Sequence, residues 1–153
     1  MKTKSIVNTQ RANLILANAH AMAKKLDCPV SFAVYFVAIK LEKSGVGGTV
    51  LRNNGFDFLD FEYLESIKNL LRLHHDQTEL LLDKAELVAQ NLQDKVIGTE
   101  HLLLAILNNI ENSEESSLSV NFMIASAGTS VAELKTELLI LLGDVDLQTS
   151  FLY

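Results

Sequence analysis

The segment at residues 95–107, "KVIGTEHLLLAIL", constrains the fold of this 153-residue chain more than any other stretch. Its last six residues, "LLLAIL", are all apolar, so a helix through them has apolar side chains on every side and must be surrounded by other elements. Thr99 is expected to cap this helix by accepting a hydrogen bond from a backbone N–H of the first turn, and Glu100 lies at the positive end of the helix dipole. The segment therefore predicts a helix at the centre of a core.

The spacing of apolar residues is helical almost throughout the chain. The first half predicts four helices, which are defined by their start and stop signals. They are a helix capped by Thr9 and ended before Pro29, a helix capped by Ser31, a short helix that ends at a left-handed Gly55, and a longer helix that begins at Asp57 or Asp60.

The second half repeats this order of helices, and the two halves align when Leu26 is placed over Leu92. The long helix follows residue 75, the buried helix follows Gly98, a short helix ends at Gly128, and the last helix is stopped by Gly143. The sequence thus predicts an all-α fold of two tandem four-helix repeats related by pseudo-twofold symmetry. We expect a single domain over residues 1–153, with repeat one at about 9–73, repeat two at about 75–143 and an apolar C-terminal tail at 144–153. The residues expected to be buried between the halves are Leu16, Val37, Leu102, Leu103, Ile106 and Leu107.

Composition narrows the class of protein further. With 48% hydrophobic and 21% charged residues, the chain has the composition of an ordinary soluble domain. A net charge of -6 argues against a nucleic-acid or anionic-membrane surface, because both require clustered Lys and Arg. The opening "MKTKSIVNTQ" has no signal-peptide core, and the single Cys28 cannot form an internal disulfide, so the cytoplasm is the expected location.

The stretch "GTEHLLLAIL", followed by a short helix, a glycine turn and "ELLILLG", resembles the second repeat of the Clp/Hsp100 amino-terminal domain, the double Clp-N motif. The resemblance covers about residues 9–143. The first repeat reads "CPVSFAVYFVAI" and lacks the signature, with Ala33 at the position of the glutamate. The resemblance implies a domain without chemistry of its own, which docks adaptors or substrate proteins for an ATP-dependent unfoldase or protease.

The same resemblance implies where a protein partner would bind. In one bacterial branch of the family, the glutamate of the motif helps bind phosphoarginine together with a threonine near the start of the repeat's first helix. The matching positions here are Glu100 with His75 and Thr9 with Ala33, so neither pair is intact and phosphoarginine recognition is not expected. We expect a polypeptide segment to bind at the helix starts in the groove between the repeats. The candidate contact residues there are Thr9, His75, Thr99, Glu100 and His101.

The end of the chain offers a second candidate for docking. Phe151, Leu152 and Tyr153 form an apolar cluster, which should either fold back on the bundle or bind a partner. The stretch "DVDLQTSFLY" also lacks the composition of a flexible linker, which favours the alternative that the protein is a free-standing regulator or adaptor of a Clp protease complex.

Signals of catalysis, metal binding and cofactor binding are weak. The stretch "SGVGGT" lacks the spacing and the lysine of a phosphate loop, so no ATP site and no cofactor are expected. His74 and His75 are adjacent but have no third metal ligand at a usable spacing, His20 is an isolated residue, and Cys28 lies in a turn before Pro29. We therefore expect no catalytic or metal-binding residues, and no enzyme activity.

Overall fold

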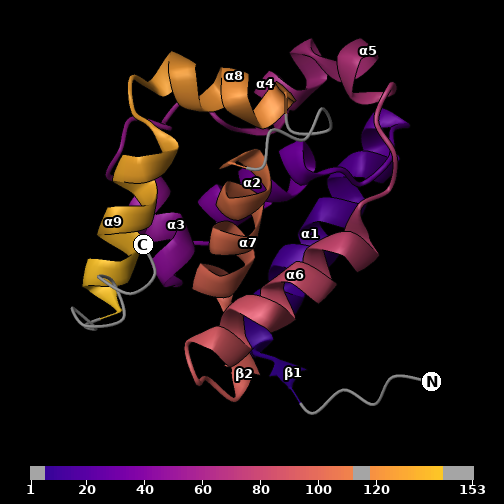
Figure 1. Ribbon diagram of the computed structural model, residues 1–153. Helices are drawn as coiled ribbons and strands as arrows, with labels where there is room; N and C mark the ends of the chain where they lie inside the picture. The colour runs from indigo at the N-terminus through magenta and orange to yellow at the C-terminus, as the bar shows by residue number, and fades with distance from the viewer. Residues whose placement is uncertain (1–5, 112–117, 143–153) are drawn as a thin grey trace.

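The computed structural model describes residues 6–111 and 118–142 and shows the predicted all-α architecture in these ranges, with one pair of very short strands (Figure 1). The first half contains β1 (Val7–Asn8), α1 (Gln10–Leu26), α2 (Phe32–Leu41), α3 (Val46–Arg52), α4 (Phe61–Ser66) and α5 (Lys68–Leu71). The second half contains α6 (Thr78–Asn91), β2 (Val96–Ile97), α7 (Thr99–Glu111), α8 (Leu118–Ala127) and α9 (Val131–Leu141).

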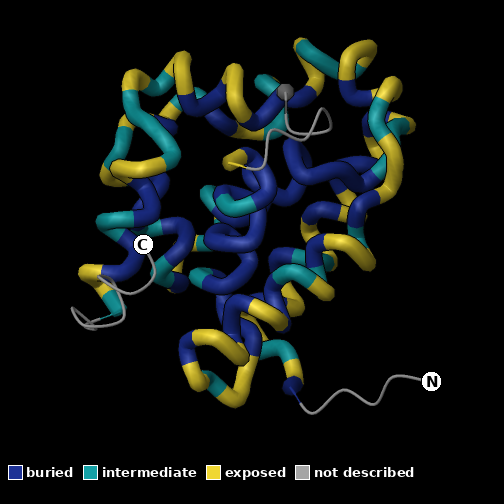
Figure 2. Tube along the Cα trace, in the orientation of Figure 1, coloured by how far each residue is buried: buried dark blue, intermediate teal, exposed yellow. Residues whose placement is uncertain are grey.

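Helix α7 lies at the centre of the molecule, as its apolar sequence predicts. It packs against α6, α3, α9 and α2, and Figure 2 shows it buried along almost its whole length. Five of the six predicted core residues are fully buried: Val37, Leu102, Leu103, Ile106 and Leu107. The sixth prediction was wrong, because Leu16 is only partly buried while its neighbour Ile15 points into the core.

The helices of the two halves correspond in their buried positions. The alignment of Leu26 with Leu92 also brings the inward-facing residues of α1 and α6 into register, namely Ile15 with Leu81, Ala19 with Ala85, Met22 with Val88, and Ala23 with Ala89. Two backbone hydrogen bonds connect the halves in a reciprocal way: Thr9 N–H donates to the Ile97 carbonyl at 2.8 Å, and Gln77 N–H donates to the Val30 carbonyl at 2.9 Å. The long helix of each half therefore starts beside the buried helix of the other half.

The predicted helix ends agree with the structure where they depend on local bonds. Thr9 caps α1 by accepting from Ala12 N–H at 3.1 Å, and Asp60 caps α4 by accepting from Tyr63 N–H at 2.9 Å. Gly55 and Gly128 have the expected left-handed backbone, with φ of 88° and 79°. The predicted single helix after Asp60 was wrong, because the backbone leaves helical geometry at Ile67 (φ −114°, ψ 18°) and separates α4 from α5.

One further expectation needs correction. Ser31 occupies the N-cap position of α2, but its side chain makes no capping bond. The stretch "SGVGG" is partly helical, because α3 begins at Val46 and includes two of the glycines. None of the described helices has the length and apolarity of a membrane span. Residues 112–117, Gly143 and the tail lie outside the described residues.

Candidate functional site

A hollow of about 370 Å³ opens where the start of α1 meets the start of α7. Three of the residues predicted to contact a partner line it: Thr9, Thr99 and Glu100. The remaining lining residues are Gln10, Arg11, Gly45, Val46 and Gly98. Each repeat thus contributes one helix start to the hollow, and the first turn of α3 forms a third wall.

The strand pair holds the two helix starts together. Strands β1 and β2 pair in parallel, with Val7 opposite Val96 and Asn8 opposite Ile97. The ladder continues into the helix start, because the N–H of Thr9 donates to the Ile97 carbonyl at 2.8 Å. Thr9 caps α1 with its side chain at the same point, so its position in the hollow is fixed by both the cap and the strand pair.

Thr99 has a different role from the one predicted. Its hydroxyl accepts a hydrogen bond from the Gly47 backbone N–H at 3.0 Å, so it does not cap its own helix. The carbonyl of Gly98 instead accepts the first helical bonds, from His101 N–H at 3.2 Å and Leu102 N–H at 3.3 Å. The close approach of α3 to the start of α7 requires glycine at position 47, because a Cβ there would lie 2.8 Å from the Thr99 carbonyl oxygen.

His101 does not line this hollow, but its ring bonds to the backbone of Gly98, which does. Its ring is 1% exposed, and Nδ1 accepts from Gly98 N–H at 2.8 Å. Nδ1 is therefore unprotonated and the Nε2–H donates to Asp94 Oδ2 at 2.7 Å. Both partners of the His101 ring lie in the second repeat. His101 therefore holds Gly98 in place, and it also lines a separate hollow of about 190 Å³ together with Glu100.

The hollow carries one free positive and one free negative side chain. Arg11 is exposed and Glu100 is partly buried, and neither forms an ion pair or hydrogen bond with another described residue. A Cβ at Gly98 would lie 2.5 Å from Glu100 Oε1, so glycine there leaves room for the Glu100 carboxylate. A ligand in the hollow could therefore contact the Arg11 guanidinium, the Glu100 carboxylate and the Thr9 hydroxyl at the start of α1.

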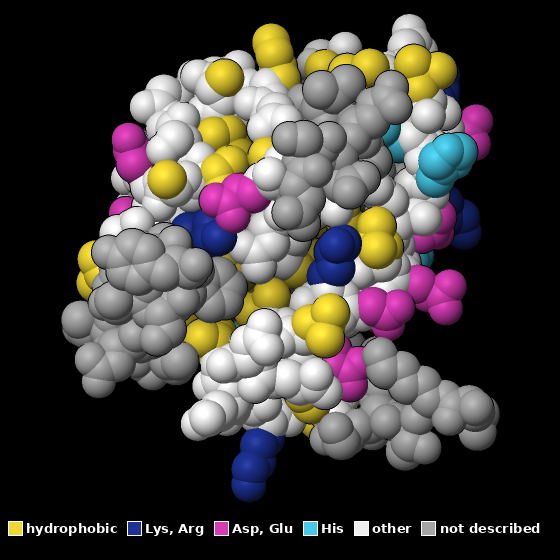
Figure 3. Space-filling view, viewed as in Figure 1, with side chains coloured by type: hydrophobic (Ala, Val, Ile, Leu, Met, Phe, Trp, Pro, Cys, Tyr) yellow, Lys and Arg dark blue, Asp and Glu magenta, His cyan; other side chains and the backbone are white. Residues whose placement is uncertain are grey.

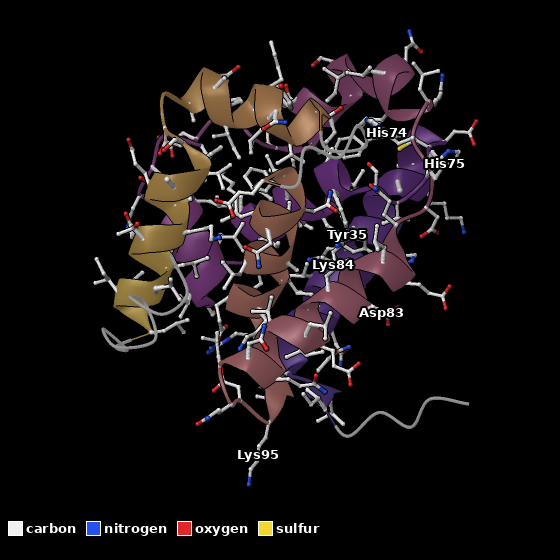
Figure 4. All side chains as sticks on the ribbon, viewed as in Figure 1. Tyr35, His74, His75, Asp83, Lys84 and Lys95 are labelled. Carbon is white, nitrogen blue, oxygen red and sulfur yellow. The ribbon has the colours of Figure 1, made fainter. Side chains whose placement is uncertain are left out.

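His75 does not belong to this hollow. It precedes α6, whereas Glu100 follows the strand beyond the other end of that 14-residue helix, which spans about 20 Å. Figure 4 shows His75 near one end of α6 and Lys95, which precedes β2, at the other. The predicted pairing of Glu100 with His75 was therefore wrong, and Thr9 of the first repeat lies in the hollow with Glu100 instead.

At the end of α6 that is far from the hollow, His74 contacts α8, whereas His75 is exposed. His74 Nε2 lies 2.9 Å from Ser119 Oγ, and partial burial together with the neighbouring His75 lowers the pKa of His74 below its ordinary value. Within the described residues, no group of three or more His, Cys, Asp or Glu side chains is placed to hold a metal ion. Phe151 and Tyr153 lie outside the described residues, so the apolar tail stays a prediction.

Sequence reasoning missed Arg11, Gln10 and Val46, although Arg11 is only two residues from Thr9. No local signal marks Val46, because it reaches the hollow through the packing of α3 against α7.

No family profile and no curated protein matches the sequence. Solved structures do match, among them the crystal structure of the Hsp104 N-terminal domain from Candida albicans, with a TM-score of 0.63 and 22% sequence identity. The match covers 89% of this chain and 91% of that chain. The protein therefore has the fold of the Clp/Hsp100 amino-terminal domain, as the signature at Gly98 to His101 predicted.

Proposed function

We propose that this protein is a non-catalytic protein-binding module, which docks adaptors or substrate proteins for an ATP-dependent unfoldase or protease. The observation that carries the proposal is the hollow between the starts of α1 and α7, in which Arg11 and Glu100 form no ion pair or hydrogen bond with another described residue. The Hsp100 N-terminal-domain fold of the chain supports the same function.

The chemistry of the hollow suits a short polypeptide segment. The hydroxyl of Thr9 and the charged groups of Arg11 and Glu100 can bond to backbone and charged groups of a segment, and Val46 supplies an apolar contact. The unpaired side chains stay hydrated until a ligand replaces the water, so the affinity should be modest. A micromolar dissociation constant corresponds to about 8 kcal/mol, and this is suited to reversible docking.

Binding of fluorescently labelled, unfolded casein to the full chain tests the proposal. Arg11→Ala and Glu100→Ala should each weaken binding about tenfold if charged contacts in the hollow carry the affinity. Glu62→Ala is the matched control, because Glu62 is exposed on α4 and makes no bond with another described residue. Casein binding that is unchanged in both hollow variants, or equally reduced in the control, would contradict this site.

A further inference from the structure

Helix α6 exposes leucines beside carboxylates on its outer face. Leu80 and Leu87 are 42% and 58% exposed, and their spacing of seven residues puts them on one side of the helix. Glu79 and Asp83 are exposed on the same side. Figure 4 shows Asp83 and Lys84 at the outer surface of α6, and hydrophobic and acidic side chains adjoin over this helix in Figure 3.

A second hollow adjoins this face. It has a volume of about 200 Å³ and lies between α6 and α7, with Leu87 at its rim. Val88 and Ala105 contribute buried apolar atoms, whereas Lys84, Asn91 and Asn108 provide polar groups. A single aliphatic side chain fits such a space, and the Lys84 ammonium and the side-chain amides can donate to carbonyl groups of the bound segment. We refer to Glu79, Leu80, Asp83, Leu87 and this hollow as the α6 surface.

The α6 surface is not a general consequence of the fold, as the corresponding face of α1 shows. In the register that aligns the buried positions of the two helices, Leu80 corresponds to Leu14, which is 48% exposed. The positions of Asp83 and Leu87 are occupied in α1 by alanines, and that of Glu79 by an asparagine. Of the two corresponding helices, α6 therefore combines exposed leucines with carboxylates and α1 does not.

Charge indicates which kind of partner fits. Of the 19 Asp and Glu residues in the chain, 13 follow residue 73, whereas only 3 of the 13 Lys and Arg residues do. Glu79 and Asp83 form no ion pair with another described residue, so both carboxylates are available to a ligand. The second half therefore attracts cations and repels anionic partners.

We infer that the α6 surface docks a cationic amphipathic segment of another protein. An aliphatic side chain of that segment enters the hollow beside Leu87, and Lys or Arg side chains about one and two helical turns away face Asp83 and Glu79. The apolar contacts supply most of the affinity, while the carboxylates select the sign of charge and accelerate encounter. This surface is separate from the hollow at Arg11 and Glu100, so a partner can use it independently.

Fluorescence anisotropy with three labelled helical peptides tests the inference. The first peptide carries leucines on one face and lysines beside them, the second has glutamate in place of every lysine, and the third has serine in place of every leucine. The first peptide should bind the full chain at least about tenfold more tightly than either of the others, and its affinity should fall with added salt. Equal binding of all three peptides would overturn the inference.

Two variants and two controls locate the binding. Glu79→Lys with Asp83→Lys should weaken binding of the lysine peptide about tenfold and improve binding of the glutamate peptide. Leu87→Ser should also weaken binding of the lysine peptide, whereas Leu14→Ser on α1 should leave this binding unchanged. The charge control is Glu62→Lys with Glu65→Lys, which changes the net charge equally on exposed positions of α4. A loss of binding that is as large in this control as in the α6 variant would mean that net charge alone attracts the peptide, and would refute the α6 surface.

Discussion

The hydroxyl of Thr99 accepts a hydrogen bond from the backbone N–H of Gly47 at 3.0 Å, across 52 residues of sequence. Thr99 is 2% exposed, so this bond lies inside the molecule, where the start of α7 meets the first turn of α3. Gly45 and Gly47 of "SGVGG" are explained by this contact, because a Cβ at either position would collide with Thr99. They allow the backbone of one repeat to approach a side chain of the other, and the candidate binding hollow forms at the edge of the contact.

The close packing at Thr99 predicts that Gly45→Ala destabilises the protein. The backbone of Gly45 (φ −91°, ψ 160°) is acceptable for alanine, so the cost comes from the collision of the new Cβ with the Thr99 side chain. We expect a loss of about 1–3 kcal/mol in the free energy of unfolding, measured by urea denaturation. Thr99→Ala should relieve the collision, so the double variant should lose less stability than the sum of the single variants. A change within about 0.5 kcal/mol for Gly45→Ala would contradict the packing.

The position of α7 predicts a large effect for Leu103→Ala. Leu103 is fully buried, and truncation of such a leucine removes apolar contacts and leaves a cavity. The free energy of unfolding should fall by about 2–5 kcal/mol in urea melts. Leu73→Ala is the matched control, because Leu73 is 76% exposed and its truncation should change stability by less than about 0.5 kcal/mol. A loss below about 1 kcal/mol for Leu103→Ala is incompatible with a core position.

Tyr35 predicts a specific loss of stability at alkaline pH. Burial raises the pKa of Tyr35 from 10.0 to about 12, although its hydroxyl lies 2.6 Å from Thr78 Oγ1. Because the unfolded chain releases this proton near pH 10.0 and the folded protein near pH 12, the folded state binds more protons in that interval. The stability due to Tyr35 is therefore complete below pH 10.0 and is lost as the pH rises through 12.

Tyr35→Phe isolates this contribution. The variant should be less stable than the parent at pH 8 by about 1 kcal/mol, because the bond to Thr78 is lost. Between pH 10.0 and 12 the parent should lose this advantage, since it alone has the Tyr35 phenol and the other tyrosines are the same in both proteins. Urea melts of both proteins over this pH range provide the measurement, and parallel stability curves would show that Tyr35 ionises as easily in the folded state as in the unfolded state.

The sequence predicts best the features that depend on neighbouring residues. The cap by Thr9, the left-handed Gly55 and the all-round burial of α7 follow from local hydrogen bonds, backbone conformation and apolar spacing. The end of the helix at Ile67 was missed, because its apolar pattern continues through the break into α5. Periodicity reports which side of a helix is buried, and says nothing of such a change in backbone direction.

The candidate site was predicted only in part for a related reason. Thr9, Thr99 and Glu100 were identified from the helix starts, but their partners were assigned within one repeat. The structure exchanges the helix starts between repeats, through the bonds from Thr9 to Ile97 and from Gln77 to Val30. The helix starts could pair within one repeat or between the two repeats, and long-range packing decides which pairing forms. Because both halves of the sequence repeat the same order of helices, the sequence does not distinguish these two pairings.

This exchange predicts that Glu100 and His75 act independently. In the casein-binding measurement, Glu100→Ala should weaken binding, whereas His75→Ala should leave the dissociation constant within about twofold of the parent, since α6 separates the two residues. The effects in the double variant should add within about 0.5 kcal/mol, as expected for distant sites without shared partners. A coupling free energy above about 1 kcal/mol would mean that one bound segment reaches both residues. Removal of Phe151, Leu152 and Tyr153 tests the competing site: if that truncation abolishes casein binding while Glu100→Ala binds like the parent, the apolar tail is the docking element and the hollow is not.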